Sequence, residues 1–327
     1  MTTTVADPAE VVRPPAPRRE VAKAWVRDRG VYVALGLLVL YNVATSEGFL
    51  SRANINLNLI QVAVTLIVSL GMAMGIGTEG IDLSVGATMA IAAVLMPDYM
   101  GYGLPVAILV AVAAGAVVGL INGLLIAVVG VQPIVATLIM LVTGRAMANV
   151  YSNGQLTEIF DPALRTLGTG STLGVPNTAL VALLLTAVVG VVVRRTTFGR
   201  RLVAIGGNLE ASTLAGLPVR RTLITVYVVS GLLAAIAGVL YTARTGAANP
   251  GQIGDLIELA AITAVVVGGT PLSGGRVRIL ATVAGALLLQ IVFATLTRNN
   301  VDAGYARIFQ AAIIVGAVYL QRDRTSS

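Results

Sequence analysis

Two carboxylates, Glu79 and Asp82, lie between strongly apolar stretches in the segment GIGTEGIDLSVGATMAIAAVL, residues 75–95. An ionisable side chain at bilayer depth costs at least about 2.5–3.5 kcal/mol if it faces lipid, so each should face a cavity, a partner or a membrane edge. Asp82 precedes an apolar run and can accept hydrogen bonds from the free amides that open a helix there. It can also line a polar route through the protein, where a carboxylate accepts hydrogen bonds in place of water. The sequence leaves both roles open.

Other polar side chains lie inside apolar runs and are candidates for the same polar route. Arg145 and Asn149 are four residues apart, which places them on one face of a helix, and we take them as the preferred substrate-side pair. Most such groups in membrane proteins form hydrogen bonds between helices, worth roughly 0.6–2 kcal/mol, so a single sequence does not separate pathway residues from packing residues. The pathway residues that we predict are Asp82, Ser84, Asn122, Gln132, Arg145 and Asn149.

The composition is that of a membrane protein without bond chemistry of its own. Of the 327 residues, 56% are hydrophobic and 11% are charged, whereas an ordinary soluble domain is about a quarter charged. The chain has no Cys and no His, which excludes thiol and imidazole catalysis, and its single lysine, Lys23, does not follow a glycine-rich loop as a Walker A site for ATP requires. We therefore expect no catalytic residue, no metal site and no cofactor bound by this chain. The net charge of +7 follows the expected membrane topology and does not indicate a nucleic-acid partner.

Ten apolar runs predict an all-α, polytopic membrane protein with about ten transmembrane helices, because a crossing needs about 20 apolar residues. The third and eighth runs, and the first to a lesser degree, are short for a crossing, which indicates broken or tilted helices near the glycine-rich motifs. We expect residues 1–30 to be a disordered cytoplasmic tail, residues 31–320 the transmembrane domain and residues 321–327 a cytoplasmic C-terminal tail. The runs cover residues 31–45, 55–77, 83–96, 104–129, 134–150, 177–193, 222–243, 256–268, 277–297 and 303–320.

Basic residues are distributed unequally between the two predicted sides of the membrane. With an inner N-terminus and ten crossings, sixteen Lys and Arg fall on inner segments and four in outer loops, and the cytoplasmic side is the one enriched in basic residues. Both termini are therefore predicted to be cytoplasmic. The outer loop 151–176 is either a docking place for an external partner or a plain connector. The inner set is Arg13, Arg18, Arg19, Lys23, Arg27, Arg29, Arg194, Arg195, Arg200, Arg201, Arg220, Arg221, Arg276, Arg278, Arg322 and Arg324, and the outer set is Arg52, Arg165, Arg244 and Arg298.

The inner loop 194–221 predicts a short helix parallel to the membrane. Asn208 is placed to cap it, Glu210 complements the dipole in its first turn, and Gly216 and Pro218 end it. The exposed face would carry Leu209, Ala211, Ser212 and Leu214, small and apolar groups that suit a groove on another protein. A solvated loop whose helix rests on lipid is the alternative.

Four motifs in this order resemble the permease subunits of ABC importers for monosaccharides, the ribose, arabinose, xylose and galactofuranose group. They are GIDLSVG at 80–86, QPIVATLI at 132–139, the inner-loop motif GR…AIGGN.EA..LAG at 199–216 and GGTPLSGGR at 268–276. In the family a further glycine usually precedes the first motif, and in this chain Glu79 replaces that glycine. The resemblance covers residues 35 to 320, and QPIVATLI with SGLLAAIAGVLY at 230–241 looks closest to the galactofuranose permeases.

The resemblance implies an inner-membrane, multi-pass permease of a bacterium that moves a monosaccharide inward by alternating access. Its implied partners are a cytoplasmic tandem ATPase, which uses the ATP, a second permease copy or paralogue and an extracytoplasmic sugar-binding protein, in addition to the sugar and the lipid bilayer. The glycine-rich motifs would break helices at Glu79, Gly80, Gly86, Gly268, Gly269, Ser273, Gly274 and Gly275. The residues implied to couple the chain to the ATPase are Gly206, Gly207, Asn208, Glu210, Ala211, Ser212, Leu214, Ala215 and Gly216. Neither the sugar nor the identity of the second permease follows from this sequence.

Two other classes of function remain as alternatives. An ion-coupled secondary transporter of a small polar solute would use Glu79, Asp82, Asp255 or Glu258 as its titrating group. An intramembrane enzyme would use paired carboxylates as acid and base. If the two glycine-rich turns at 79–80 and 274–275 meet at the inner surface, Glu79 would pair with Arg276.

Overall fold

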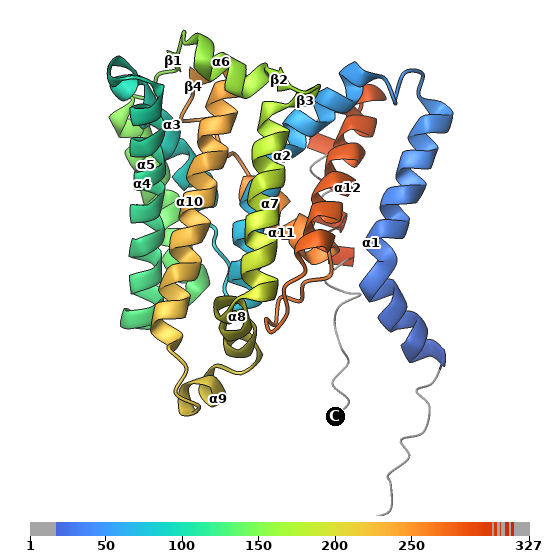
Figure 1. Ribbon diagram of the computed structural model, residues 1–327, viewed down its shortest axis with the longest axis vertical. Helices are drawn as coiled ribbons and strands as arrows, with labels where there is room; N and C mark the ends of the chain where they lie inside the picture. The colour runs from blue at the N-terminus through green and yellow to red at the C-terminus, as the bar shows by residue number, and fades with distance from the viewer. Residues whose placement is uncertain (1–17, 303, 306–307, 309–310, 314, 317–327) are drawn as a thin grey trace, which may run out of the picture.

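The computed structural model describes residues 18–302, 304–305, 308, 311–313 and 315–316, and almost all of its elements are helices (Figure 1). The short strands form two antiparallel pairs, β1 with β4 and β2 with β3. In chain order the elements are α1 (Arg18–Thr45), α2 (Arg52–Gly77), α3 (Val85–Tyr99), η1 (Met100–Tyr102), α4 (Leu104–Leu124), η2 (Leu125–Val129), α5 (Pro133–Tyr151), β1 (Thr157–Glu158), α6 (Pro162–Thr169), β2 (Ser171–Thr172), β3 (Val175–Pro176), α7 (Asn177–Arg195), α8 (Thr197–Gly207), α9 (Leu209–Leu214), α10 (Val219–Thr245), β4 (Ala247–Ala248), α11 (Ile257–Val267) and α12 (Ile279–Arg298).

Among the described residues, six helices are long and apolar enough to cross a membrane, namely α2, α4 continued by η2, α5, α7, α10 and α12. Each of the first nine predicted runs coincides with one helix, and the tenth run, 303–320, falls largely outside the described residues. The third and eighth runs are short helices, as predicted, because α3 has 15 residues and α11 has 11. The chain is thus a helical, multi-pass membrane protein, while the full number of ten crossings stays a prediction.

The N-terminal helix starts earlier than the sequence analysis expected. Helix α1 begins at Arg18, so residues 18–30 are helical and do not belong to a tail that extends to residue 30. The segment RREVAKAWVRDRG, residues 18–30, follows Pro17 and contains no proline itself. It is rich in Ala, Arg, Glu and Lys, which favour helix. The remainder of the predicted tail, residues 1–17, and the predicted C-terminal tail, 321–327, lie outside the described residues.

Helices α2 and α10 form the centre of the bundle. In their most apolar windows 78% of α2 and 61% of α10 are buried, against 22% of α5 and 28% of α4 and of α7. Helix α4 approaches α10 through glycines: a Cβ added at Gly119 would meet the backbone of Tyr227 and Val228, and one added at Gly115 would meet the carbonyl of Gly231. The small-residue pattern GAVVGLING therefore permits close packing of two helices, as its spacing predicts.

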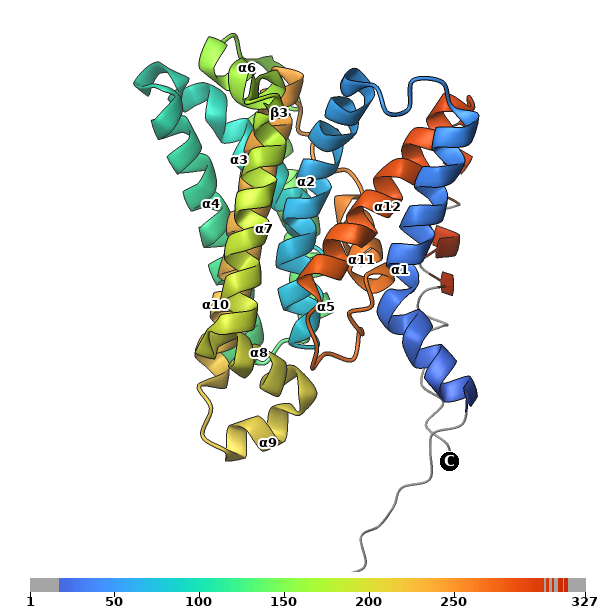
Figure 2. The same cartoon turned by 45° about the vertical axis from the view of Figure 1, so that its right-hand side comes forward.

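The two ends of the bundle differ in structure. One end, which we call the α6 end, carries β1, α6, β2 and β3, and the opposite α9 end carries α8 and α9 together with the start of α1 (Figures 1 and 2). Segment 194–221, with its six arginines, lies at the α9 end.

Candidate functional site

The break between α2 and α3 places Asp82 in a buried polar cluster. Asp82 is 1% exposed, and its Oδ1 accepts from the amide and the hydroxyl of Ser84 at 3.0 and 2.6 Å. Its Oδ2 accepts from the Ser230 hydroxyl of α10 at 2.7 Å, and the Asn122 side-chain amide of α4 donates to Ser84 Oγ at 2.8 Å. One oxygen of Asp82 therefore satisfies an amide just before α3, as the capping interpretation requires, and the other binds a different helix.

This cluster unites three of the six predicted pathway residues, Asp82, Ser84 and Asn122, and adds two that were not among the six. Ser230 is one, and its only signal was a hydroxyl within an apolar run. Thr137 of α5 is the other, and its hydroxyl donates to the Ile81 carbonyl at 3.0 Å. The break between α2 and α3 is therefore tied to α4, α5 and α10 at once.

Two polar atoms beside the Asp82 cluster have no hydrogen-bond partner among the described residues. They are Asn122 Oδ1 and the hydroxyl of Tyr227, which is 1% exposed. A Cβ added at Gly80 would contact that hydroxyl, so the glycine leaves the space that Tyr227 occupies. A buried polar group without a partner costs about 1–3 kcal/mol. A cluster that retains two of them is not optimised for stability alone, which makes it a candidate functional site.

A second interruption precedes α11, where Arg145 of α5 holds an irregular segment. Its guanidinium donates to the carbonyls of Pro250 at 3.3 Å, Ile253 at 2.6 Å and Gly254 at 2.5 Å. Backbone that leaves a helix at membrane depth needs partners within the protein, since lipid offers none. Arg145 is thus half-buried and supplies donors for the carbonyls of the segment 250–254.

Glu258, in the first turn of α11, lies at the same interruption. It is 7% exposed, and its Oε2 has no hydrogen-bond partner in the part of the chain that the structure describes. A Cβ added at Gly86 of α3 would lie 2.9 Å from Glu258 Oε2 and 3.1 Å from Arg145 Nη2, and would collide with the Gly254 carbonyl. Gly86 therefore allows the starts of α3 and α11 to pack against each other, with a cation and a carboxylate beside the contact.

Two other predicted pathway residues, Asn149 and Gln132, lie outside both interruptions. Asn149 is exposed and donates to the Arg145 carbonyl at 3.1 Å, so it shares a helix face with Arg145 but its amide is bonded within its own helix. Gln132 is exposed at the start of α5 and forms no side-chain capping bond. In the described ranges, the side chains of Asn149 and Gln132 form no hydrogen bond with the Asp82 cluster or with the segment 250–254 that Arg145 holds. Gly86 lies in the first turn of α3 and not in a break, because the helix already begins at Val85.

Three glycine-rich motifs meet at the α9 end, in a contact that we call the glycine junction. The amide of Gly275 donates to the Gly77 carbonyl at 3.1 Å, so the two turns predicted to meet are in contact. A Cβ added at Gly206 of α8 would collide with the Gly77 carbonyl and lie 2.7 Å from the Gly275 amide. Gly274, whose φ of +72° favours glycine, packs against Glu79. The pairing of Glu79 with Arg276 stays a prediction.

The other glycine-rich residues at this end also shape tight contacts. Gly268 ends α11, and a Cβ there would meet the backbone of Ala281 in α12. Gly269 follows with a φ of +82°, and Ser273 lies in the loop that leads to α12. The motif at 268–276 thus forms most of the connection between α11 and α12, which runs from 268 to 278.

The predicted short helix is present as α9. Asn208 Oδ1 accepts from the Ala211 amide at 2.8 Å, Glu210 lies in the first turn, and Gly216 follows with a φ of +73°. Leu209 and Leu214 are 51% and 83% exposed, as an outward-facing apolar surface requires.

Two of the expected coupling residues do not face outward. Ser212 is 4% exposed, because it lies on the side of α9 that faces the protein, and Gly206 is buried in the glycine junction. Helix α8, which carries Gly206, was not foreseen. It is capped by Thr196, whose hydroxyl accepts from the Gly199 amide at 3.5 Å.

Comparison with known proteins assigns the family. A model described as the permease component of branched-chain amino acid transport systems matches residues 54–318. The galactofuranose transporter permease of Escherichia coli K12 is 35% identical over 92% of this chain and 91% of its own length. The ribose import permeases of E. coli K12 and Bacillus subtilis 168 are 35% and 38% identical, over 94% and 91% of this chain and 97% and 93% of theirs. No solved structure matches.

The chain belongs to this family of transport-system permeases. It is a transmembrane permease subunit of an ABC importer and not an enzyme. The suspected resemblance is therefore confirmed at the level of the family. The galactofuranose and ribose permeases match about equally well, so the comparison does not single out the galactofuranose subgroup.

Proposed function

We propose that this chain carries a monosaccharide across the inner membrane of a bacterium, driven by separate ATPase subunits. The observation that carries the proposal is identity of about 35% to sugar import permeases over more than nine-tenths of the chain. The α9 end faces the cytoplasm, because segment 194–221 contains six arginines and basic loops stay on that side. Ten crossings then put both termini in the cytoplasm as well.

The partners of the chain follow from these two faces. A cytoplasmic tandem ATPase binds at the α9 end, where Leu209 and Leu214 offer an apolar surface that suits a groove. A second permease copy or a paralogue completes the pathway. An extracytoplasmic sugar-binding protein delivers the sugar at the α6 end, to which the loop 151–176 contributes α6 and three short strands.

Movement of the ATPase reaches the membrane part of the chain through the glycine junction. Helix α8 connects to α9 at Asn208 and packs through Gly206 on the end of α2. Beyond that end lies the break that holds Asp82, whose partners are on α4 and α10. Because backbone contacts of this kind cannot be compressed, displacement of α8 has to move the break or separate the junction.

The sugar passes beside the two interrupted helices. In transporters, discontinuous helices supply backbone and polar side-chain groups to the substrate near the bilayer midplane. Here the Asp82 cluster supplies hydroxyl, amide and carboxylate groups, and the interruption before α11 supplies the Arg145 guanidinium and the Glu258 carboxylate. Sugar hydroxyls form hydrogen bonds with all of these groups. These two regions, rather than Gln132 and Asn149, are the core of the pathway that we propose.

Reconstitution tests the proposal. Proteoliposomes that contain this chain, its tandem ATPase and its binding protein should accumulate a labelled monosaccharide only with internal ATP and all three components. A secondary transporter would behave differently, since the chain alone would carry the solute down a proton or sodium gradient. Uptake by the chain alone under an ion gradient would therefore refute the proposal.

Leu214→Asp is expected to weaken binding of the ATPase at least about tenfold. A carboxylate in place of the most exposed apolar side chain of α9 would have to be desolvated in the ATPase groove, at a cost of about 1.4 kcal/mol or more, which is tenfold in affinity. Binding of purified ATPase to the chain in nanodiscs measures this. The matched control is Leu173→Asp at the α6 end, where the leucine is 99% exposed and the substitution should not change ATPase binding.

A further inference from the structure

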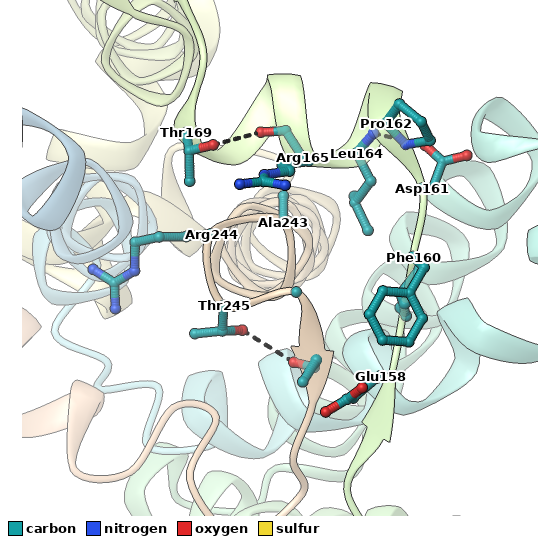
Figure 3. A pocket seen from close by; sticks show the side chains of 13 residues that line it. Glu158, Phe160, Asp161, Pro162, Leu164, Arg165, Thr169, Ala243, Arg244 and Thr245 are labelled. Carbon is teal, nitrogen blue, oxygen red and sulfur yellow. Dashed lines mark hydrogen bonds between the residues drawn. The ribbon is translucent and has the colours of Figure 1, made fainter.

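A hollow of about 720 Å³ opens at the α6 end, between α6, β1 and the C-terminal end of α10 (Figure 3). Its walls belong to the α6 end of the bundle and include Gly246 and Ala247, which follow α10. Buried Leu164 forms part of its floor, and polar and aromatic side chains surround it. The side chains that matter for its chemistry are those of Glu158, Phe160, Asp161, Arg165, Arg244 and Thr245.

The walls of this hollow are fixed by backbone contacts. Strand β1 pairs with β4, and the Ile159 amide donates to the Gly246 carbonyl at 2.8 Å. Asp161 Oδ1 accepts from the Leu164 amide at 2.7 Å and caps α6. Gly168 of α6 packs so closely on Ala243 that an added Cβ would collide with its carbonyl. The hollow is therefore preformed, which reduces the ordering cost of binding a ligand.

Charges of both signs line the hollow without neutralising one another. The side chains of Glu158, Arg165 and Arg244 form no hydrogen bond or ion pair with any described residue, and the Arg244 guanidinium lies 5.0 Å from the centre of the Tyr241 ring. Phe160 also lines the hollow and is 90% exposed, so its ring is accessible to a ligand.

These groups match the surface of a ring sugar. Hydroxyl groups accept from guanidinium and donate to carboxylate, while the C–H face of the ring packs against an aromatic side chain. The volume lies within the range of about 300–1,000 Å³ that is typical of small-molecule sites. A purely anionic or cationic ligand would suit this lining less well, because one of its two charge types would then be repelled.

We propose that the hollow is an entry site that weakly binds the monosaccharide which the binding protein releases at the α6 end. The inference rests on the proposed function, since it concerns where the transported sugar first contacts this chain. Weak binding is what the site requires, because a substrate that bound tightly here would not move on into the membrane part.

Saturation-transfer NMR on the full chain in lipid nanodiscs tests the entry site, with D-ribose, D-galactose and D-fructose as probes at millimolar concentration. At least one sugar should give a transfer signal, and Phe160→Ala should lower that signal about fivefold, because the stacking surface is lost. Tyr102→Ala is the matched control, since Tyr102 is 75% exposed at the same end but outside the hollow, and it should leave the signal unchanged.

Three outcomes would overturn the entry site. In the first, the wild-type chain supports uptake in the complete transporter but gives no transfer signal with any of the three sugars. In the second, the wild-type and Phe160→Ala chains give the same signal. The third is a Phe160→Ala chain that loses only its affinity for the binding protein, which would make the hollow a protein-docking surface. The proposed function fails separately, if the complete transporter carries none of the three sugars and no other monosaccharide.

Discussion

Gly206→Ala is expected to uncouple sugar uptake from ATP hydrolysis. The added methyl group would collide with the Gly77 carbonyl and lie 2.7 Å from the Gly275 amide, and neither backbone group can move without shifting α2 or the 274–275 turn. Overpacking of this kind costs about 1–3 kcal/mol, which corresponds to a roughly fivefold to 150-fold loss in the conformational step. The ATPase should still bind, because Leu209 and Leu214 remain exposed on α9. Uptake per ATP hydrolysed in proteoliposomes is the quantity to measure.

The neighbouring glycine provides a matched control for this experiment. A Cβ added at Gly207 would meet only Gly275 Cα, at 4.0 Å, which is an ordinary contact. Gly207→Ala should therefore keep the wild-type ratio of uptake to hydrolysis. If the two alanine variants have the same ratio, α8 does not transmit movement through the glycine junction.

Arg145→Met is expected to destabilise the chain by about 3 kcal/mol or more and to abolish uptake. The carbonyls of Pro250, Ile253 and Gly254 would lose their donors, and Glu258 would lose the nearby positive charge while it remains buried. A buried polar group that loses its hydrogen-bond partner costs about 1–3 kcal/mol, and three carbonyls would lose theirs, which gives about 3 kcal/mol or more. Thermal unfolding in nanodiscs measures the stability, and Arg29→Met, at an exposed arginine of α1, serves as the control.

A second substitution separates the two contributions of Arg145. In Arg145→Met with Glu258→Gln the uncompensated carboxylate is gone, so part of the stability should return, but uptake should stay absent because the 250–254 segment is still unsupported. If Glu258→Gln restores nothing in the Arg145→Met background, the two side chains are not coupled and Glu258 does not belong to this region.

The sequence predicted the elements whose signals are local. Helix α9 was foreseen because Asn208, Glu210 and Gly216 are an N-cap, a first-turn acid and a C-terminal glycine at the correct spacing. The short helices α3 and α11 were foreseen because apolar runs of that length cannot cross a membrane. The meeting of the turns at 77 and 275 was foreseen because both were placed on one side of the membrane.

The contacts that define the candidate sites were less predictable, because they join residues far apart in the chain. Ser230 binds Asp82 across 148 residues, and nothing near Ser230 distinguishes its hydroxyl from one that packs between helices. Gly206 was expected to face the ATPase because it belongs to the coupling motif, whereas its lack of a side chain serves the contact with Gly77 and Gly275. Gly86 likewise owes its identity to Arg145 of α5, Gly254 of the segment before α11 and Glu258 of α11, which all approach it.

The Cys-free sequence allows a direct test of whether the α9 end drives the break between α2 and α3. Cysteines introduced at the exposed positions Glu79 and Tyr102 carry spin labels, one at the break between α2 and α3 and one at the α6 end. Labelled chains are diluted with unlabelled ones in the complete transporter, so that the measured distance joins two labels of the same chain. The distance distribution between the labels should differ between the ATP-free and ATP-bound complexes, and Gly206→Ala should remove that difference while ATP still binds. An unchanged distribution in a complex that transports sugar, or a difference that persists in Gly206→Ala, would contradict the account.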